Sequence, residues 1–267
     1  MAAEQWLKVR VLRLTDGINP KILLALFRAR DSGTRAYRRI GGVLLRGNKV
    51  ECPCCGSRFR VFALRNRVCW HCSSRERHRA LKMYFDAHPG MLRPGMRILH
   101  VAPEPSITEV LKSKPGVEYC GGDLERRFGP LYIDVMDINF PDATFDGVVC
   151  NHVLEHVPDD QKALREIRRV LKPSGWAILL IPSIRGETTI EDATVTDSAE
   201  RERLFGQHDH FRWYGWDYLQ RLESAGLTPE VFKAEEHWSA DAIERLRLRG
   251  SLGIDPIFVG RAGTAGP

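Results

Sequence analysis

Five of the seven cysteines in the chain lie between residues 52 and 72. Four of them form two Cys-x2-Cys pairs separated by thirteen residues: Cys52, Cys55, Cys69 and Cys72. Two such pairs can place four thiolates around one tetrahedral ion, which leaves no open position for a substrate. The spacing therefore predicts a structural zinc site, with Cys54 as a spare thiol and His71 as an alternative ligand.

Two histidine clusters could accept a proton, because the ordinary pKa of histidine lies near neutrality. The first is HVLEH, with His152, Glu155 and His156, and the second is FGQHDHFRWYG, with His208, Asp209 and His210. The second cluster is polar and rich in aromatic residues, which makes it the stronger candidate. A metal site made of its two histidines and Asp209 is a weaker alternative, because no third separated ligand stands out.

From residue 96 onward, short β-rich runs alternate with helical stretches. This alternation predicts an α/β domain with a mostly parallel sheet and helices on its faces. We expect seven strands, at residues 97–102, 117–122, 132–137, 145–151, 177–181, 230–234 and 256–260. We expect helices near residues 76–88, 106–113, 159–171 and 215–225.

Four segments between residues 97 and 182 resemble the core of class I S-adenosylmethionine (SAM)-dependent methyltransferases, of the group often called type 11. They are RILHVAPEPS, YCGGDLE, DVMDINFPDATFDGVVCNHVLEHV and ALREIRRVLKPSGWAILLIP. The resemblance covers about a third of the chain, and the last two segments are its most specific part. It implies a Rossmann-like α/β fold with a seven-stranded, mostly parallel sheet, helices on both faces and SAM as cofactor.

Ligands of open parallel sheets bind at the carboxyl ends of the strands. The resemblance implies SAM-binding residues at four such ends: His100, Ala102, Glu104, Ser106, Asp123, Leu124, Asp137, Ile138, Asn151 and His152. Asp123 would accept hydrogen bonds from the ribose hydroxyls, with Leu124 as a wall for the adenine. Asp137 would reach the exocyclic amine of the adenine.

The first of these loops departs from the family pattern, which has an acid followed by alternating glycines. His100 stands in the place of the acid, and Ala102, Glu104 and Ser106 stand in the places of three glycines. Glycine lets a backbone approach a ligand closely. We therefore expect SAM to bind with changed contacts, with His100 or Glu104 replacing the acid and the helix start at Ser106 offering free N–H groups.

Methyl transfer from a sulfonium requires alignment of the acceptor and, for a hydroxyl or amine, removal of a proton. We predict His208, His210 and His152 as the candidate catalytic residues. The first two lie in residues 183–214, which we expect to be an insertion that builds the acceptor region, shaped by Arg212, Trp213 and Tyr214.

The charge is divided unevenly along the chain. Residues 1–82 hold 19 Lys+Arg against 5 Asp+Glu, whereas the remaining residues hold 21 (40 − 19) against 29 (34 − 5). This division indicates two modules with different roles. We expect a basic segment at 1–48, a zinc-ribbon-like module at 49–75, a linker helix at 76–95 and the methyltransferase domain at 96–267.

The basic half could bind RNA or a membrane surface, or it could be a solvated face. A short helix with Ile22, Leu23, Leu26 and Phe27 on one face could serve such contacts or pack on the main domain. No apolar run approaches the ~20 residues that span a bilayer, and the chain lacks a signal-peptide pattern, so we expect a cytoplasmic protein.

The sequence favours transfer of a methyl group to an oxygen or nitrogen atom of a small molecule or glycan. The main alternative is an RNA (rRNA) methyltransferase that binds RNA through its basic zinc module. A second alternative is a non-catalytic scaffold, because the first loop is poor in glycine.

Overall fold

The computed structural model describes residues 35–126, 129–250 and 252–263. The expected helix around residues 22–27 lies outside these ranges. The chain forms two compact units, and each is built from two pieces of sequence. Unit 1 comprises Met1–Met83 and His237–Ser251, and unit 2 comprises Tyr84–Glu236 and Leu252–Pro267.

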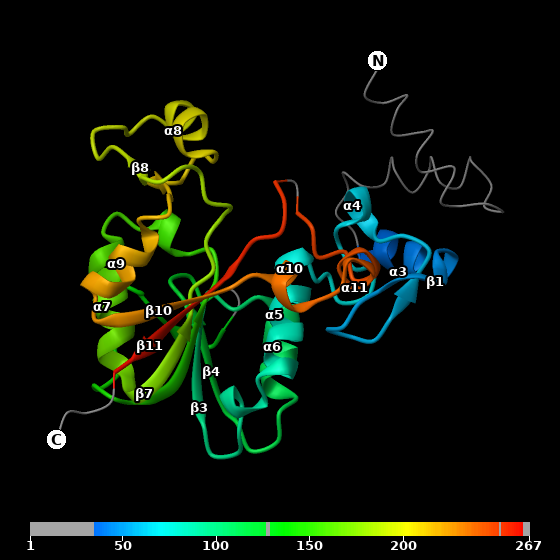
Figure 1. Ribbon diagram of the computed structural model, residues 1–267, viewed down its shortest axis with the longest axis horizontal. Helices are drawn as coiled ribbons and strands as arrows, with labels where there is room; N and C mark the ends of the chain where they lie inside the picture. The colour runs from blue at the N-terminus through cyan, green and yellow to red at the C-terminus, as the bar shows by residue number, and fades with distance from the viewer. Residues whose placement is uncertain (1–34, 127–128, 251, 264–267) are drawn as a thin grey trace. The chain divides into compact units, whose positions relative to one another are not determined.

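A seven-stranded sheet forms the centre of unit 2, with the strand order β5-β4-β3-β6-β7-β11-β10 (Figure 1). The strands are β3 (Arg97–Val101), β4 (Glu118–Asp123), β5 (Leu131–Tyr132), β6 (Phe145–Cys150), β7 (Leu171–Ile178), β10 (Leu227–Phe232) and β11 (Ile257–Ala262). Neighbours from β5 to β7 are parallel, and β11 is antiparallel to both β7 and β10. The predicted seven-stranded, mostly parallel sheet is confirmed.

The order of the strands reverses at β3, which pairs with β4 on one side and β6 on the other. Such a reversal opens a crevice at the carboxyl ends of the two diverging strands. The loops that follow β3 and β6 therefore meet at this place, although residues 102 and 151 are far apart in sequence.

Helices cover the two faces of the sheet: α6 (Pro105–Lys112) lies on one face, and α7 (Asp160–Val170) and α9 (Tyr218–Ser224) lie on the other (Figure 1). Helix α7 begins where the Asp159 side chain accepts a hydrogen bond from the N–H of Lys162. It buries Ala163, Leu164, Ile167 and Val170, whose spacing places them on one helical face.

One predicted strand is shorter than expected. The run 132–137 was expected to be a strand, but β5 ends at Tyr132. The carboxylate of Asp134 accepts a hydrogen bond from the N–H of Met136, and the N–H of Asp137 donates to the carbonyl of Asp134 at 3.0 Å. An aspartate that binds its own backbone in this way forms a turn and ends the strand.

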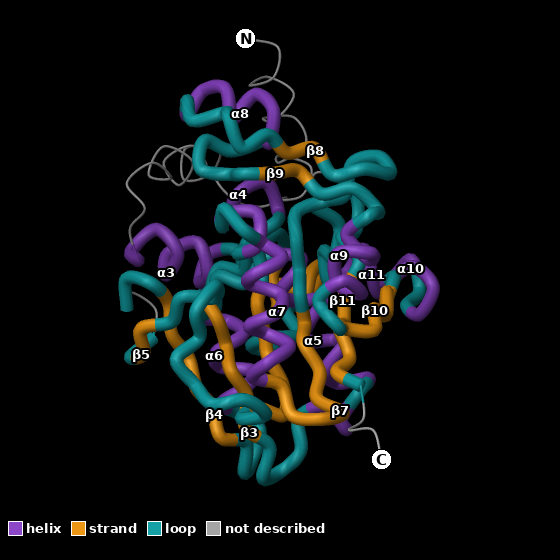
Figure 2. The backbone as a smooth tube through the Cα atoms, turned by 90° about the vertical axis from the view of Figure 1, so that its left-hand side faces the viewer, coloured by secondary structure: helices purple, strands orange, loops and turns teal. Residues whose placement is uncertain are grey.

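Residues 183–214 contain a small structured layer beyond the end of β7. It consists of β8 (Ile190–Glu191) paired antiparallel with β9 (Arg212–Trp213), and of α8 (Ser198–Phe205) (Figures 1 and 2). The N–H of Phe211 donates to the carbonyl of Glu155 at 2.8 Å. The layer is thereby joined to the turn η3 (Leu154–His156) that follows β6.

Unit 1 contains short elements around the cysteines: α3 (Arg35–Leu44), β1 (Arg46–Glu51), β2 (Arg58–Phe59), α4 (Ala63–Asn66) and α11 (Ala240–Arg245). Helix α5 (Glu76–Ala87) runs from unit 1 into unit 2, where the turn η2 (Pro89–Met91) follows, and α10 (Ala234–His237) ends at the other boundary. In the described part of the chain, no helix has the length and apolar character needed to cross a membrane.

Candidate functional site

The four cysteines of the two Cys-x2-Cys pairs converge in unit 1. The sulfur atoms of Cys52 and Cys72 lie 3.5 Å apart, those of Cys55 and Cys69 lie 3.7 Å apart, and all four ligand atoms lie within 4.8 Å of one another. Four sulfurs at about 2.3 Å from one tetrahedral ion are about 3.8 Å apart. The four residues therefore fit a structural zinc ion.

Each cysteine pair lies in its own backbone turn, and the two turns have the same geometry. The N–H groups of Gly56 and Ser73 donate to the carbonyls of Cys52 and Cys69, at 2.8 and 3.0 Å. Both residues have a positive φ, of 67° and 63°. Gly56 adopts this conformation without strain, whereas Ser73 does not. The hydrogen bond with Cys52 raises the pKa of the Cys72 thiol, as expected for thiols that cannot all ionise without a cation.

The predicted ligands are thus brought together, the thiol of Cys54 lies beside that of Cys52, and His71 lies apart from the cluster. His71 is exposed and contacts the hydroxyl of Ser57 at 3.3 Å. The thiol of Cys54 faces the carbonyl of His78 at 3.5 Å.

The carboxyl ends of β3 and β6 in unit 2 bring together three of the predicted cofactor residues. His100 is fully buried, with Nδ1 3.2 Å from the hydroxyl of Tyr119 and Nε2 facing the N–H of Glu104 at 3.5 Å. Asn151 donates from Nδ2 to the Glu104 carboxylate at 3.0 Å. Within the described residues, the buried Oδ1 of Asn151 has no hydrogen-bond partner.

Three further predicted residues lie beside this group. Ala102 follows β3 with a positive φ of 48°, and its N–H donates to the carbonyl of Gly122 at 2.9 Å. Asp123 ends β4, is 9% exposed, and accepts a hydrogen bond from the N–H of Glu125 at 2.9 Å. Ser106 is buried in the first turn of α6.

The remaining cofactor candidates are more dispersed. Leu124 is 57% exposed, and Asp137 is exposed in the turn after β5. Ile138 is buried, and its N–H donates to the carboxylate of Glu166 at 2.9 Å. Its side chain belongs to the hydrophobic core.

The candidate proton acceptors are divided between two groups. His152 has a positive φ of 52°, and its Nδ1 lies 3.3 Å from the carboxylate of the buried Glu155. His210 is buried beside His156, with the two ring centroids 4.6 Å apart, and burial lowers the pKa of His210. His208 is exposed and is not part of either group.

Residues 95–179 match the family model described as "Methyltransferase domain". This range includes β3 to β7, α6 and α7, and therefore the whole carboxyl edge described above. The chain carries a class I methyltransferase domain.

Similar proteins include methyltransferases with different acceptors. A 27-O-demethylrifamycin SV methyltransferase of Amycolatopsis mediterranei is 32% identical over 129 residues, covering 47% of this chain and 44% of that protein. An ajmaline N-methyltransferase of Rauvolfia serpentina is 30% identical over 129 residues, covering 46% and 43%. A demethylmenaquinone methyltransferase of Bacillus cereus is 27% identical over 131 residues, covering 49% and 54%. The chain spans about half the length of these curated relatives.

Solved structures resemble the chain at lower identity. The YcgJ protein of Bacillus subtilis has a TM-score of 0.45 and 18% identity, covering 71% of this chain and 100% of that one. A SAM-dependent methyltransferase of Archaeoglobus fulgidus has a TM-score of 0.44 and 16% identity, covering 69% and 94%.

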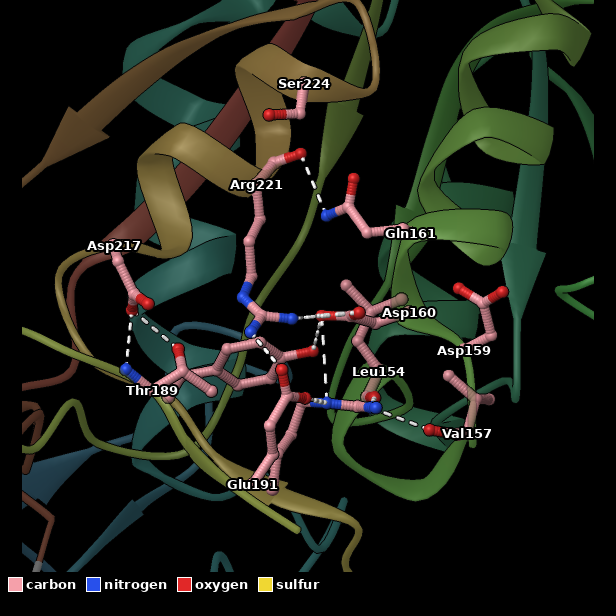
Figure 3. A network of polar contacts seen from close by, with 12 residues as sticks. Leu154, Val157, Asp159, Asp160, Gln161, Thr189, Glu191, Asp217, Arg221 and Ser224 are labelled. Atoms are coloured by element: carbon pink, nitrogen blue, oxygen red, sulfur yellow. Dashed lines mark hydrogen bonds and ion pairs between the residues drawn. The ribbon is translucent and has the colours of Figure 1, made fainter. Parts of the chain in front are cut away.

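Asp160, in the first turn of α7, is the centre of a polar network (Figure 3). It accepts hydrogen bonds from the Tyr214 hydroxyl at 2.9 Å and from Arg221 at 3.0 Å. Arg221 also pairs with Glu191, and although burial opposes the shift, this partner holds the pKa of Glu191 below its ordinary value.

Arg212 belongs to the same network and is 4% exposed. It donates to the carbonyls of Leu154, Val157 and Pro158 at 2.7 to 2.9 Å. Arg212 and the buried Tyr214 were expected to shape an acceptor region. In the structure, the guanidinium of Arg212 binds the turn after β6, and the hydroxyl of Tyr214 binds Asp160 at the start of α7.

Sequence reasoning passed over two residues of the methyltransferase domain. The first acid after β5 is Asp134 rather than Asp137, because the strand ends at Tyr132. Glu155 was noted only as part of a cluster, yet it is 1% exposed and contacts His152. A buried acid cannot be recognised in HVLEH from spacing alone, because its burial depends on segments that arrive from residues 205–212.

Proposed function

We propose that the chain is a SAM-dependent methyltransferase that transfers a methyl group to an oxygen or nitrogen atom of a small molecule or glycan. SAM supplies an activated methyl group on a sulfonium, so the protein has to bind it, orient the acceptor and remove a proton. The methyltransferase domain and relatives that include an O- and an N-methyltransferase support this proposal.

The observation that carries the proposal is the Glu104 carboxylate at the point where the strand order reverses. Its hydrogen bond from Asn151 holds it between the ends of β3 and β6. SAM bears a positive sulfonium and a positive amine, and a fixed carboxylate complements positive charge. Glu104 thus supplies the acid that the family pattern has at position 100, and the unsatisfied Oδ1 of Asn151 offers a further acceptor.

The other predicted residues have defined places in this proposal. Asp123 at the end of β4 would accept the ribose hydroxyls, with Leu124 beside the adenine, and Ala102 and Ser106 would offer backbone N–H groups. His100 would act through the loop, because it is buried under Glu104. For the adenine amine, Asp134 joins Asp137 as a candidate, and Ile138 remains a candidate contact of the adenine ring.

Among the candidate bases, His152 has the strongest structural support. A carboxylate at Nδ1 orients an imidazole and leaves Nε2 to accept a proton, as in other acid–histidine pairs. The carboxylate of Glu155 lies 3.3 Å from Nδ1 of His152 without a hydrogen bond among the described residues, and a small side-chain rotation would bring it into this relation. His210 is bound through Nδ1 to a backbone carbonyl, and His208 is exposed, so both are weaker candidates.

Calorimetric titration with S-adenosylhomocysteine tests the cofactor site. We expect micromolar binding to the folded, zinc-loaded protein, a loss of at least about tenfold in Glu104→Gln, and a loss of binding in Asp123→Ala. Glu109→Gln, which changes an exposed glutamate of α6, is the matched control and should bind normally. Absence of binding to the folded wild-type protein would contradict the proposal and favour the non-catalytic scaffold.

A groove in unit 1 favours RNA as a second candidate acceptor. It has a volume of about 1110 Å³ and includes Arg38, Arg39, Arg46 and Arg58 in its lining. Trp70 and Phe59 also line it, but they are 5% and 3% exposed. Buried rings cannot stack on bases, so the groove suits the phosphate backbone rather than a particular base sequence.

The salt dependence of RNA binding tests this second candidate. Each lost phosphate contact reduces the slope of log K against log salt concentration by about 0.7 to 0.9. The double variant Arg39→Ala/Arg46→Ala should therefore bind single-stranded RNA more weakly and with a smaller slope. Arg165→Ala, an exposed arginine of α7, should leave both quantities unchanged. Equal slopes for all three proteins would contradict an RNA-binding groove.

A further inference from the structure

A second group of metal-ligating side chains lies in the methyltransferase domain, separate from the cysteines. It comprises Glu155 and His156 in η3, and His210 in the segment after α8. One ligand atom from each residue lies within 4.8 Å of the other two. Ligands bound at about 2.1 Å to one ion are at most about 4.2 Å apart. Small side-chain rotations would therefore bring the three atoms to binding distance.

Both histidines have the second contact that metal-bound histidines usually have. Nδ1 of His210 lies 2.9 Å from the carbonyl of Phe205, and Nδ1 of His156 lies 3.2 Å from the carboxylate of Asp209. A carbonyl or carboxylate at Nδ1 takes the ring proton and orients the imidazole. The lone pair is then on Nε2 of both rings, which is the form that binds a metal.

Glu155 lacks the hydrogen bonds that a buried carboxylate normally has. It is 1% exposed, and neither of its oxygens has a hydrogen-bond partner among the described residues. Its contact with Nδ1 of His152, at 3.3 Å, is an ion pair only if the imidazole is protonated. A buried carboxylate without donors is unfavourable, and a bound cation would compensate its charge.

Hydrogen bonds that do not involve the three ligand side chains hold the two segments together. The N–H of Phe211 donates to the carbonyl of Glu155, and Arg212 donates to the carbonyls of Leu154 and Val157. These bonds fix the segment around His210 against η3. The three ligand side chains therefore converge in a frame that other residues maintain, as in preformed metal sites.

We propose that Glu155, His156 and His210 bind a divalent transition metal ion. Two imidazoles and one carboxylate suit zinc and its neighbours in the periodic table, whereas magnesium and calcium prefer oxygen ligands alone. Three protein ligands leave a coordination position for water or for an oxygen of the acceptor. The ion would lie next to His152. This metal site is a function additional to the proposed methyl transfer, which needs no metal.

Metal analysis of the whole protein, dialysed against a small excess of Zn²⁺, tests this site. We expect two equivalents in the wild-type protein. Glu155→Gln and His156→Gln should each retain one equivalent, and Cys72→Ser should also retain one, at the other site. His208→Ala removes the exposed histidine next to the site and should retain two.

Cobalt substitution identifies which site is filled. Co²⁺ bound by thiolates gives strong sulfur-to-cobalt charge-transfer absorption, and Co²⁺ bound by histidine and carboxylate does not. The second equivalent of Co²⁺ should therefore add only weak visible bands, and these should be absent in Glu155→Gln and His156→Gln. A single equivalent in the wild-type protein, or two equivalents in both folded variants, would overturn the proposal. Binding of S-adenosylhomocysteine is measured separately, so a failure of the metal site is distinguishable from a failure of the cofactor site.

Discussion

Ala102 occupies a backbone conformation that favours glycine, at the loop where a cofactor would approach. Its φ of 48° lies in the left-handed region, which costs a residue with a Cβ atom about 1–2 kcal/mol. The replacement of glycine by alanine in this loop has therefore not moved the backbone out of the left-handed region. The alanine adopts the glycine conformation and tolerates the strain.

Ala102→Gly should relieve this strain. We expect the free energy of unfolding to rise by about 0.5–1 kcal/mol, because the gain exceeds the extra flexibility of glycine in the unfolded chain. The affinity for S-adenosylhomocysteine should rise as well, since a Cβ atom is removed from the approach path. Ala143→Gly is the control: Ala143 is exposed and has a φ of 51°. It should be stabilised equally in urea unfolding, with unchanged affinity. A lower affinity of Ala102→Gly would contradict this account of the loop.

The two cysteine turns allow a paired prediction, because they share one backbone geometry with different residues at the fifth position. Gly56→Ala introduces strain at a φ of 67°, where, among the described residues other than its chain neighbours, no atom lies within 4 Å of the new Cβ. Ser73→Gly removes strain at a φ of 63°. Thermal unfolding of the zinc-loaded protein should show destabilisation by about 1 kcal/mol in the first variant and stabilisation by about 0.5 kcal/mol in the second. Effects of the same sign would show that side-chain contacts, not backbone strain, dominate at these positions.

At the scale of helices and strands, local patterns were sufficient for most of unit 2. The apolar spacing of α7 and the alternation of strand and helix are properties of neighbouring residues, and they predicted the sheet. The predicted end of β5 was wrong because the carboxylate of Asp134 competes with the strand for backbone hydrogen bonds. Hydrophobic patterning does not register that competition.

The part of the candidate site that follows from strand pairing was predictable from the sequence. Glu104 and Asn151 follow different strands, and their contact follows from the parallel pairing of β3 and β6. Arg212 and Tyr214 could not be assigned in this way. Their partners lie 54 to 58 residues earlier in the chain, and no short motif records which segment an inserted layer will contact.

The network around Asp160 gives a prediction at this scale. Tyr214→Phe removes one buried hydrogen bond to a carboxylate and should lower the free energy of unfolding by about 1.5–3 kcal/mol. Asp160→Asn removes the negative charge that balances the guanidinium groups of Arg212 and Arg221. It should lower the free energy of unfolding by about 3–5 kcal/mol. Tyr132→Phe, at a residue that is 52% exposed, should change stability by less than about 0.5 kcal/mol. Equal stabilities of Tyr214→Phe and Tyr132→Phe in urea unfolding would contradict the network.

At the scale of the whole molecule, the chain passes between its two units at residues 83/84, 236/237 and 251/252. Unit 1 is therefore closed by a segment from the far end of the sequence. Arg79, which is fully buried, donates to the carbonyls of Leu246 and Arg247 at 2.6 and 2.5 Å. It also donates to the carbonyl of Ser74 at 2.8 Å, in the second cysteine turn.

Arg79 thus links the zinc site to the returning segment, and loss of zinc should affect both. Cys72→Ser removes one ligand, so we expect zinc loss and faster amide hydrogen exchange in α11, together with a lower-temperature transition of unit 1 in calorimetry. The transition of unit 2 should stay in place, because the hydrophobic cluster that includes Leu99 and Phe258 contains no residue of unit 1. Cys54→Ser removes the spare thiol and should retain zinc and both transitions. If Cys72→Ser lowered both transitions together, the two units would unfold as one cooperative structure, and the zinc site would stabilise the methyltransferase domain as well.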